Sequence, residues 1–172
     1  MTLDVPAGQL QIANAAVDTT AAELNRAADV STRLVAAGAA LSVTVAAHAD
    51  RVILLDTLAG STCTLPAATG TGARFYFVVS VLATSNNHII KVADASDIMQ
   101  GMILTHSDNA ADAVIGWRTA DDSDTITLNR TTSGSLERGE WFELLDVATD
   151  LYLVRGVTAA TGTEVTPFSA TV

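Results

Sequence analysis

The sequence predicts a mainly β fold, an antiparallel β-sandwich or barrel that follows an extended N-terminal arm and one helix. Short runs rich in β-branched and aromatic residues recur about every 8–12 residues after Gly38, and turn residues separate them. No alternation of strands with helices follows, which argues against a doubly wound α/β fold. We therefore divide the 172 residues into an arm over 1–19, a helix over 20–38 and a β-sandwich domain over 39–172 that ends in a Thr/Gly-rich tail.

The arm and the helix are predicted from different patterns. Residues 1–19 lack a clear period and contain Pro6 and Gly8, which favours extended chain. Residues 20–23 match a capping box, in which a Thr hydroxyl and a Glu carboxylate satisfy free amides at a helix start. Gly38 supplies the stop, because glycine readily takes the left-handed conformation that ends a helix. Between them lies an apolar stripe at near-helical spacing, formed by Leu24, Ala27, Ala28 and Val35.

Ten segments are predicted as strands. Residues 42–45 alternate polar and apolar side chains, which is the period of a half-buried strand. Nine further β-rich runs cover residues 51–56, 61–65, 74–83, 88–93, 99–105, 113–118, 124–129, 140–145 and 151–155. The tail, residues 156–172, is either a last strand or a second arm, with Phe168 as a packing anchor. Strand order is not predicted, so jelly-roll, β-tulip and other Greek-key arrangements stay open.

The charge of the chain excludes two classes of partner. Its formal net charge is −10, from 9 Lys and Arg against 19 Asp and Glu. Lys91 is the only lysine and no two basic residues are adjacent, whereas binding to nucleic acid or to an anionic membrane needs clustered basic side chains. No apolar run approaches the roughly 20 residues that span a bilayer, and the first residues do not resemble a signal peptide. We expect synthesis in a cytoplasm, with neither a nucleic acid nor a membrane as partner.

The apolar composition favours self-association. Hydrophobic residues make up 49% of the chain, but aromatic residues only 5%. Much of the apolar fraction is alanine, which buries little area per residue. Because such a chain gains stability by burying surface against copies of itself, we expect a homo-oligomer.

The side chains that most often carry catalysis form no recognisable motif. His48, His88 and His106 lie outside any Gly-x-Ser-x-Gly or His-Glu-x-x-His pattern, and we expect them to be surface or strand-end histidines. Cys63 is the only cysteine, which excludes an intrachain disulfide and a cysteine-based zinc site. We therefore predict a protein that is not an enzyme and has no cofactor and no metal.

Three further features have both a functional and a structural interpretation. Residues 121–124 carry three aspartates, but they lack the spacing of an EF-hand loop, so a solvated turn is favoured over a Ca²⁺ site. Residues 68–72 contain two glycines without a following Gly-Lys-Ser/Thr, which favours a hairpin or bulge over a phosphate cradle. Trp117 and Trp141 lie in predicted strands, and packing in the core or at a subunit interface is favoured over an exposed carbohydrate platform.

Two stretches resemble virion proteins of tailed bacteriophages. Residues 19–26, which read TTAAELNR, are followed by 29–31 and resemble a TAAELN segment found in many such proteins, fibres included. The second stretch begins at Gly60 with the run TLPAATGTG over 64–72 and continues through 77–79, 84–86, 89–92, 124–129 and 166–168. This pattern is similar to small head-decoration, or cement, proteins.

The resemblance implies a β-sandwich or β-tulip module without catalytic residues, often trimeric, on the three-fold positions of a phage head. Such a protein would bind the major capsid protein at the outer surface of the virion and stabilise the head. The predicted contact residues are Leu24, Ala27, Ala28 and Val35 between subunits, and Leu3, Val5, Leu10 and Ile12 in a capsid-anchoring arm. The alternatives are a receptor-binding or fibre module of a phage tail or head fibre, and a cellular β-sandwich.

Overall fold

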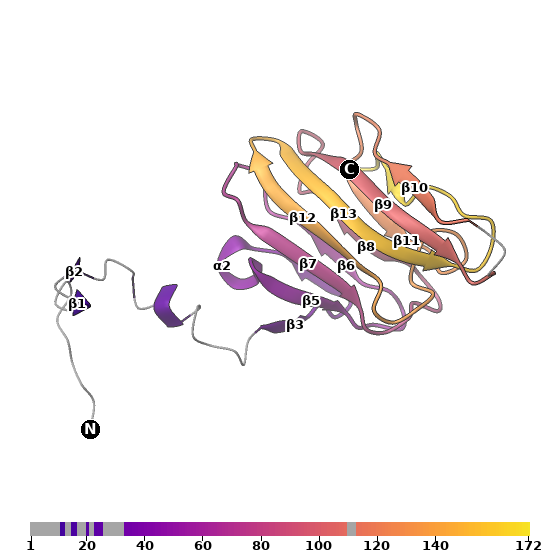
Figure 1. The fold of residues 1–172 in the computed structure, drawn as a ribbon, viewed down its shortest axis with the longest axis horizontal. Helices are drawn as coiled ribbons and strands as arrows, with labels where there is room; N and C mark the ends of the chain where they lie inside the picture. Colours follow the sequence, from indigo (N-terminus) through magenta and orange to yellow (C-terminus); the bar gives the residue numbers. More distant parts are fainter. Residues whose placement is uncertain (1–10, 13–14, 17–19, 21–22, 26–32, 110–112) are drawn as a thin grey trace, which may run out of the picture. The chain divides into compact units, whose positions relative to one another are not determined.

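The computed structural model describes residues 11–12, 15–16, 20, 23–25, 33–109 and 113–172. The chain divides into two units, residues 1–32 and 33–172, and each is described here by itself. The larger unit contains two layered β-sheets and confirms the predicted mainly β fold (Figure 1).

The described part of the first unit contains a hairpin and a capped helical turn. β1 (Gln11–Ile12) pairs antiparallel with β2 (Ala15–Ala16), so these four residues of the predicted extended arm form a hairpin instead. The Thr20 amide donates to a Glu23 carboxylate oxygen at 2.7 Å, and the Glu23 amide donates to the Thr20 hydroxyl at 3.2 Å. These reciprocal bonds confirm the predicted capping box, and residues 23–25 are helical.

The larger sheet of the second unit has seven strands in the order β10-β9-β13-β12-β7-β5-β3. Its strands are β3 (Leu34–Ala36), β5 (Arg51–Leu55), β7 (Arg74–Val79), β9 (Ile98–Ser107), β10 (Ile115–Arg118), β12 (Trp141–Ala148) and β13 (Leu151–Ala160). The second sheet has five strands in the order β14-β11-β8-β6-β4. They are β4 (Ala40–Ser42), β6 (Thr62–Thr64), β8 (His88–Lys91), β11 (Thr125–Leu128) and β14 (Phe168–Ser169).

Both sheets are mixed rather than purely antiparallel. From β3 to β8 the chain places successive strands in alternate sheets, so each strand reaches its sheet neighbour after crossing to the other layer and back. Strands that follow each other in this way run parallel, as in the pairs β3–β5, β5–β7, β4–β6 and β6–β8. The antiparallel hairpins β9–β10 and β12–β13 both lie in the seven-stranded sheet.

The core lies between the two sheets. One buried cluster takes Phe77, Phe142 and Ile103 from the seven-stranded sheet, and Ile90 and Ile126 from the five-stranded sheet. The rings of Phe77 and Phe142 stack with centroids 5.2 Å apart and planes 13° apart. Phe168 joins the same cluster from β14, so the tail forms a last strand and Phe168 is the anchor that the sequence predicts.

Two predicted boundaries are wrong. Val35 lies in β3, paired with Ile53 of β5, so the helix predicted over 20–38 does not extend through this residue. Gly38 does adopt the expected left-handed conformation, with φ +60°, but it follows a strand. The strand predicted over 42–45 ends at Ser42 because the Thr44 hydroxyl accepts the Ala47 amide and caps the short helix α2 (Val45–His48).

Candidate functional site

The main candidate site is the solvent-side face of the seven-stranded sheet. Strand register places one apolar residue from each of six adjacent strands in a single row across this face, and none of the six is buried. The row consists of Leu104, Val157, Trp141, Val78, Leu54 and Ala36. We call this face, with the two rows described next, the outer apolar face.

Two neighbouring rows complete the outer apolar face. The middle row runs across all seven strands as Arg118, Met102, Arg155, Glu143, Tyr76, Val52 and Leu34. The third row is Gln100, Leu153, Leu145 and Arg74. Several of the largest apolar side chains are well exposed, including Leu34 at 62%, Met102 at 50% and Leu153 at 43%. A sheet that packs one face on the core and leaves the other face in solvent would be expected to show mainly polar residues on this outer face.

One stacked aromatic pair and two ion pairs lie on or beside the outer apolar face. Trp141 stacks on Tyr76 with ring centroids 5.4 Å apart and planes 24° apart. Beside this pair an Arg155 guanidinium nitrogen lies 3.2 Å from a Glu143 carboxylate oxygen. At the first residue of β7, Nε of Arg74 lies 3.8 Å from a carboxylate oxygen of Asp50. Burial, and secondarily the Glu143 charge, raises the pKa of Tyr76 above its usual value, so its ring carries no charge at neutral pH.

Three shallow hollows lie between the projecting side chains. One of about 270 Å³ is lined by Leu145, Leu153 and Glu143, and one of about 340 Å³ by Val52, Tyr76 and Glu143. The third, of about 480 Å³, lies beside Met102 and Arg118. Gly101 borders the first and third hollows, and an added Cβ there would clash with the Val154 carbonyl oxygen. The backbone in this region therefore requires glycine.

The solvent-side face of the five-stranded sheet has a different composition. Its two registered rows are Thr127, Ile89, Thr62 and Ala40, and Thr125, Lys91, Thr64 and Ser42. Hydroxyl groups dominate these rows, and Ile89 is their only large aliphatic side chain. The five-stranded sheet therefore shows the alternation of apolar-inward and polar-outward residues that is typical of a sheet with one solvated face.

The predicted glycine loop over 68–72 is closed around a carboxylate of the chain itself. Asp146 of β12 accepts the amides of Thr69, Gly70 and Thr71 at 3.0, 2.6 and 2.9 Å, and the Thr71 hydroxyl at 2.6 Å. Burial alone would raise the pKa of Asp146, but the combined hydrogen bonds outweigh it and hold that pKa below its usual value. Because Asp146 already occupies the amides that a phosphate would need, the loop has a structural role. It is not the predicted hairpin, since it connects β6 and β7, which lie in different sheets.

The acidic segment over 121–124 is also structural where it is buried. Asp121 and Asp122 are exposed, whereas the Asp124 carboxylate accepts the amides of Thr171 and Val172 at 2.8 and 3.1 Å. Burial again opposes ionisation, and these bonds with one from the Thr125 hydroxyl lower the pKa of Asp124 overall. Asp124 thereby fixes the residues that follow β14. Within the described residues, no group of three or more His, Cys, Asp or Glu side chains is placed to hold a metal ion.

His88 and Cys63 are both buried. His88 is buried; its Nδ1 accepts the Ser61 amide at 3.0 Å and its Nε2–H donates to the Val81 carbonyl at 2.9 Å. Burial lowers the pKa of His88, against smaller opposing effects of that carbonyl and of Asp56, so the ring is neutral at pH 7. Cys63 is buried, and burial with a smaller effect of Asp56 raises the pKa of its thiol to about 12.

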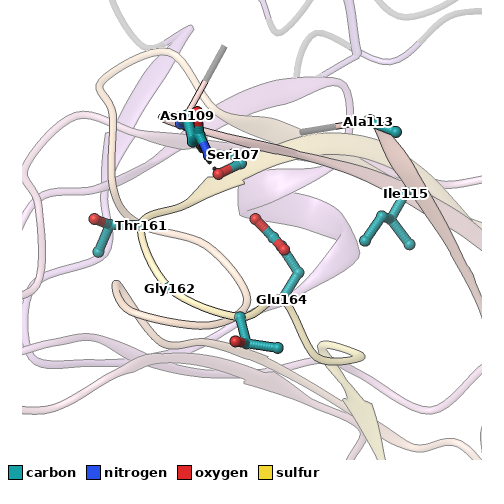
Figure 2. Close-up of a pocket in the computed structure, with 8 residues that line it drawn as sticks. Ser107, Asn109, Ala113, Ile115, Thr161, Gly162 and Glu164 are labelled. Atoms are coloured by element: carbon teal, nitrogen blue, oxygen red, sulfur yellow. Dashed lines mark hydrogen bonds between the residues drawn. The ribbon is translucent and has the colours of Figure 1, made fainter. Parts of the chain in front are cut away.

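A separate polar pocket of about 470 Å³ lies where the β9–β10 hairpin meets the loop after β13 (Figure 2). Ser107 and Asn109 line it from one side and Ile115 from another, and Figure 2 shows the Glu164 side chain projecting into the space that they surround. In the described part of the chain, one oxygen of Glu164 is buried without a hydrogen-bond partner. Residues 110–112, which connect the two strands, lie outside the described residues.

The structure describes only some of the predicted contact residues. Leu24 is exposed in the helical turn and Val35 lies in β3, while Ala27 and Ala28 fall outside the described residues. Of the predicted arm contacts, Ile12 lies in β1, and Leu3, Val5 and Leu10 fall outside the described residues. Trp117 packs against the core from β10, whereas Trp141 lies on the outer apolar face.

Sequence reasoning missed the outer apolar face, although a signal was present. β5 reads RVILL, β7 reads RFYFVV, β12 begins WFELL and β13 begins LYLV, so apolar residues occupy both faces of these strands. Strands of this kind are typical of sheets covered on both sides. By contrast, β6 reads TCT and β11 reads TITL, with polar and apolar residues alternating.

No family model, curated protein or solved structure matches the chain at a significant level. Among the described residues, no helix is long and apolar enough to cross a membrane.

Proposed function

We propose that this chain is a structural subunit of a tailed-bacteriophage particle, a decoration or cement protein that binds the outer surface of the head as a homo-oligomer. The observation that carries the proposal is the outer apolar face, a broad apolar surface outside a core that is already complete. A face of this kind marks a binding surface for another protein. Such a face is expected on a protein that functions as a subunit of a larger assembly.

Residues 64–72 and 124–129 resemble head-decoration proteins, and this resemblance is the reason for proposing that class of assembly protein. Both segments have structural roles in this fold. The first forms the loop fixed by Asp146, and the second contains Asp124 and β11. A rigid β-sandwich that repeats on a lattice multiplies weak contacts, because several copies of one oligomer engage the capsid at once. The net charge of −10 suits a position outside the DNA-filled shell.

Cryo-electron microscopy of the particle that carries this protein tests the proposal. We expect density for the sandwich at regular positions of the outer capsid lattice, in contact with the major capsid protein, and we expect heads without the protein to release DNA at a lower temperature. Density on the tail, or on fibres projecting from the particle, would instead support the receptor-binding alternative that the TAAELN segment allows. Absence of density from every part of the particle would overturn both.

The role of the first residues is tested on the same particles. We expect replacement of Leu3, Val5, Leu10 and Ile12 by serine to lower the occupancy of the lattice sites while leaving the melting temperature of the sandwich unchanged, because these residues belong to the unit over 1–32. Full occupancy by this variant would contradict an anchoring arm.

A further inference from the structure

We propose that the outer apolar face binds a second copy of this chain, so that the seven-stranded sheet, and not a helix, forms the interface of the homo-oligomer. The inference rests on the proposed function in that it names the partner of the same surface. Three properties of the face argue for a second copy as its occupant: its sequence pattern, its charge and its size.

The sequence pattern shows that the face is built to be covered. The middle strands of the sheet, β7 and β12, carry apolar or aromatic residues on both sides, whereas every registered row of the five-stranded sheet's outer face carries hydroxyl groups. Trp141 and Tyr76 lie near the centre of the face, and Arg155 lies beside them. Tryptophan, tyrosine and arginine are the residues that contribute most to binding energy at the centres of protein interfaces.

The charge of the face favours a copy of this acidic chain over a strongly charged partner. The three rows contain only one acidic residue, Glu143, and it is paired with Arg155. Two chains of net charge −10 repel each other, and contact through this face brings few carboxylates together. The rows also contain Arg74 and Arg118, and Arg74 lies close to Asp50. Three arginines against Glu143 and Asp50 leave a formal charge of +1, so the face lacks the cluster of basic side chains that nucleic acid or a polyacidic protein would recognise.

The size of the face suits a subunit contact. The seven strands are spaced about 4.8 Å apart, and each longer strand carries three outward residues about 6.8 Å apart. The flat area of the face is therefore roughly 600 Å², and the projecting side chains add to the surface that a partner can contact. A stable interface buries about 800 Å² on each partner, so one face supplies most of what a subunit contact needs. The projecting Met102, Leu104 and Leu153 are of a size to enter hollows like those beside Glu143 on a facing copy.

Sedimentation velocity of the full chain tests the inference over a wide range of protein concentration. The wild-type chain is expected to sediment as an oligomer. The double variant Leu104→Lys with Leu153→Lys places two charges on the face at positions already 39% and 43% exposed, so the fold is expected to survive. We expect its self-association constant to fall about 100-fold or more, because a charge buried in an apolar contact is strongly unfavourable.

The matched control places the same two charges on the other sheet. Ala40→Lys with Ser42→Lys changes exposed residues of β4 and is expected to sediment as the wild type does. A wild-type chain that stays monomeric at every concentration overturns the inference, and so does a Leu104/Leu153 variant that keeps the wild-type mass with a wild-type circular-dichroism spectrum. Binding to heads is measured separately. A wild-type chain that is monomeric at every concentration and still decorates heads overturns the inference while leaving the proposed attachment to the head intact. A wild-type oligomer that never binds the particle overturns the proposed function and leaves the inference intact.

Discussion

The two sheets of the sandwich are alike on their inner faces and differ on their outer faces. Inside, both contribute large apolar side chains to one core, such as Phe77 from one sheet and Ile126 from the other. Outside, the five-stranded sheet presents threonine and serine, and the seven-stranded sheet presents a row of six apolar residues. Since packing of the core does not need that row, its composition points to an interaction of the whole molecule. The difference between the inner and outer faces distinguishes residues that stabilise the fold from residues that are expected to contact another subunit.

The largest expected effect comes from the inner faces, which set the scale for the comparison. Phe77→Ala removes a ring that stacks on Phe142 and leaves a cavity between the sheets. We expect the free energy of unfolding to fall by about 3–5 kcal/mol, measured by urea denaturation at a dilution where the wild type is monomeric. A loss comparable to that of an outer-face substitution would contradict the assignment of the core.

A smaller effect is expected from the carboxylates that fix a loop beside each sheet. Asp146→Asn weakens four hydrogen bonds to the loop over 69–71, and we expect a loss of about 2–3 kcal/mol. Asp124→Asn affects bonds to Thr171, Val172 and Thr125 next to the five-stranded sheet, and a loss of about 1–2 kcal/mol is expected. The exposed Asp150→Asn serves as control. The reverse order of the two losses would show that the loop over 69–71 holds itself without Asp146.

Acid should destabilise the sandwich in two steps. The pKa of His88 is lowered in the fold, so its contribution is complete above about pH 6.5 and is lost as the pH falls below that value. The lowered pKa values of Asp146 and Asp124 give stability that is present above about pH 4 and is lost as the pH falls further. Glu140, whose burial raises its pKa, acts in the opposite direction. We expect His88→Asn to flatten the stability profile below about pH 6.5, and Asp146→Asn to flatten it below about pH 4. Unchanged slopes would contradict these assignments.

The smallest effect on folding is expected on the outer apolar face itself. Leu153→Ala removes a half-exposed side chain, so the stability of the dilute monomer should change by less than about 0.5 kcal/mol. The effect should grow with protein concentration, because the lost contact belongs to the assembly. The matching change Thr64→Ala on the five-stranded sheet should show no dependence on concentration. Equal behaviour of the two variants would remove the distinction between the faces.

Most strands could be predicted from the sequence, because β-branched runs bounded by turn residues mark where strands begin and end. Their pairing could not, since a turn signal does not say whether the chain stays in one sheet or crosses to the other, and the crossings make β3, β5 and β7 parallel. The near-helical spacing of Val35 from Leu24 and Ala28 predicts a helix, and pairing of Val35 with β5 overrides that pattern. The self-association predicted from composition stays a prediction. Its proposed location moves from a helix stripe to the outer apolar face, because only strand register reveals that Leu104, Trp141 and Leu54 share a row.

Two methionines of β9 provide the most direct test that the outer apolar face is covered. Met99 faces the core and is 0% exposed, while Met102 lies on the outer apolar face and is 50% exposed in the single chain. Peroxide oxidation of each, followed by mass spectrometry at increasing protein concentration, compares them within one molecule. We predict that Met102 oxidises quickly in dilute solution and becomes protected as the chain assembles, while Met99 is protected throughout. Rapid oxidation of Met102 at every concentration, in a sample shown to be oligomeric, would contradict burial of this face.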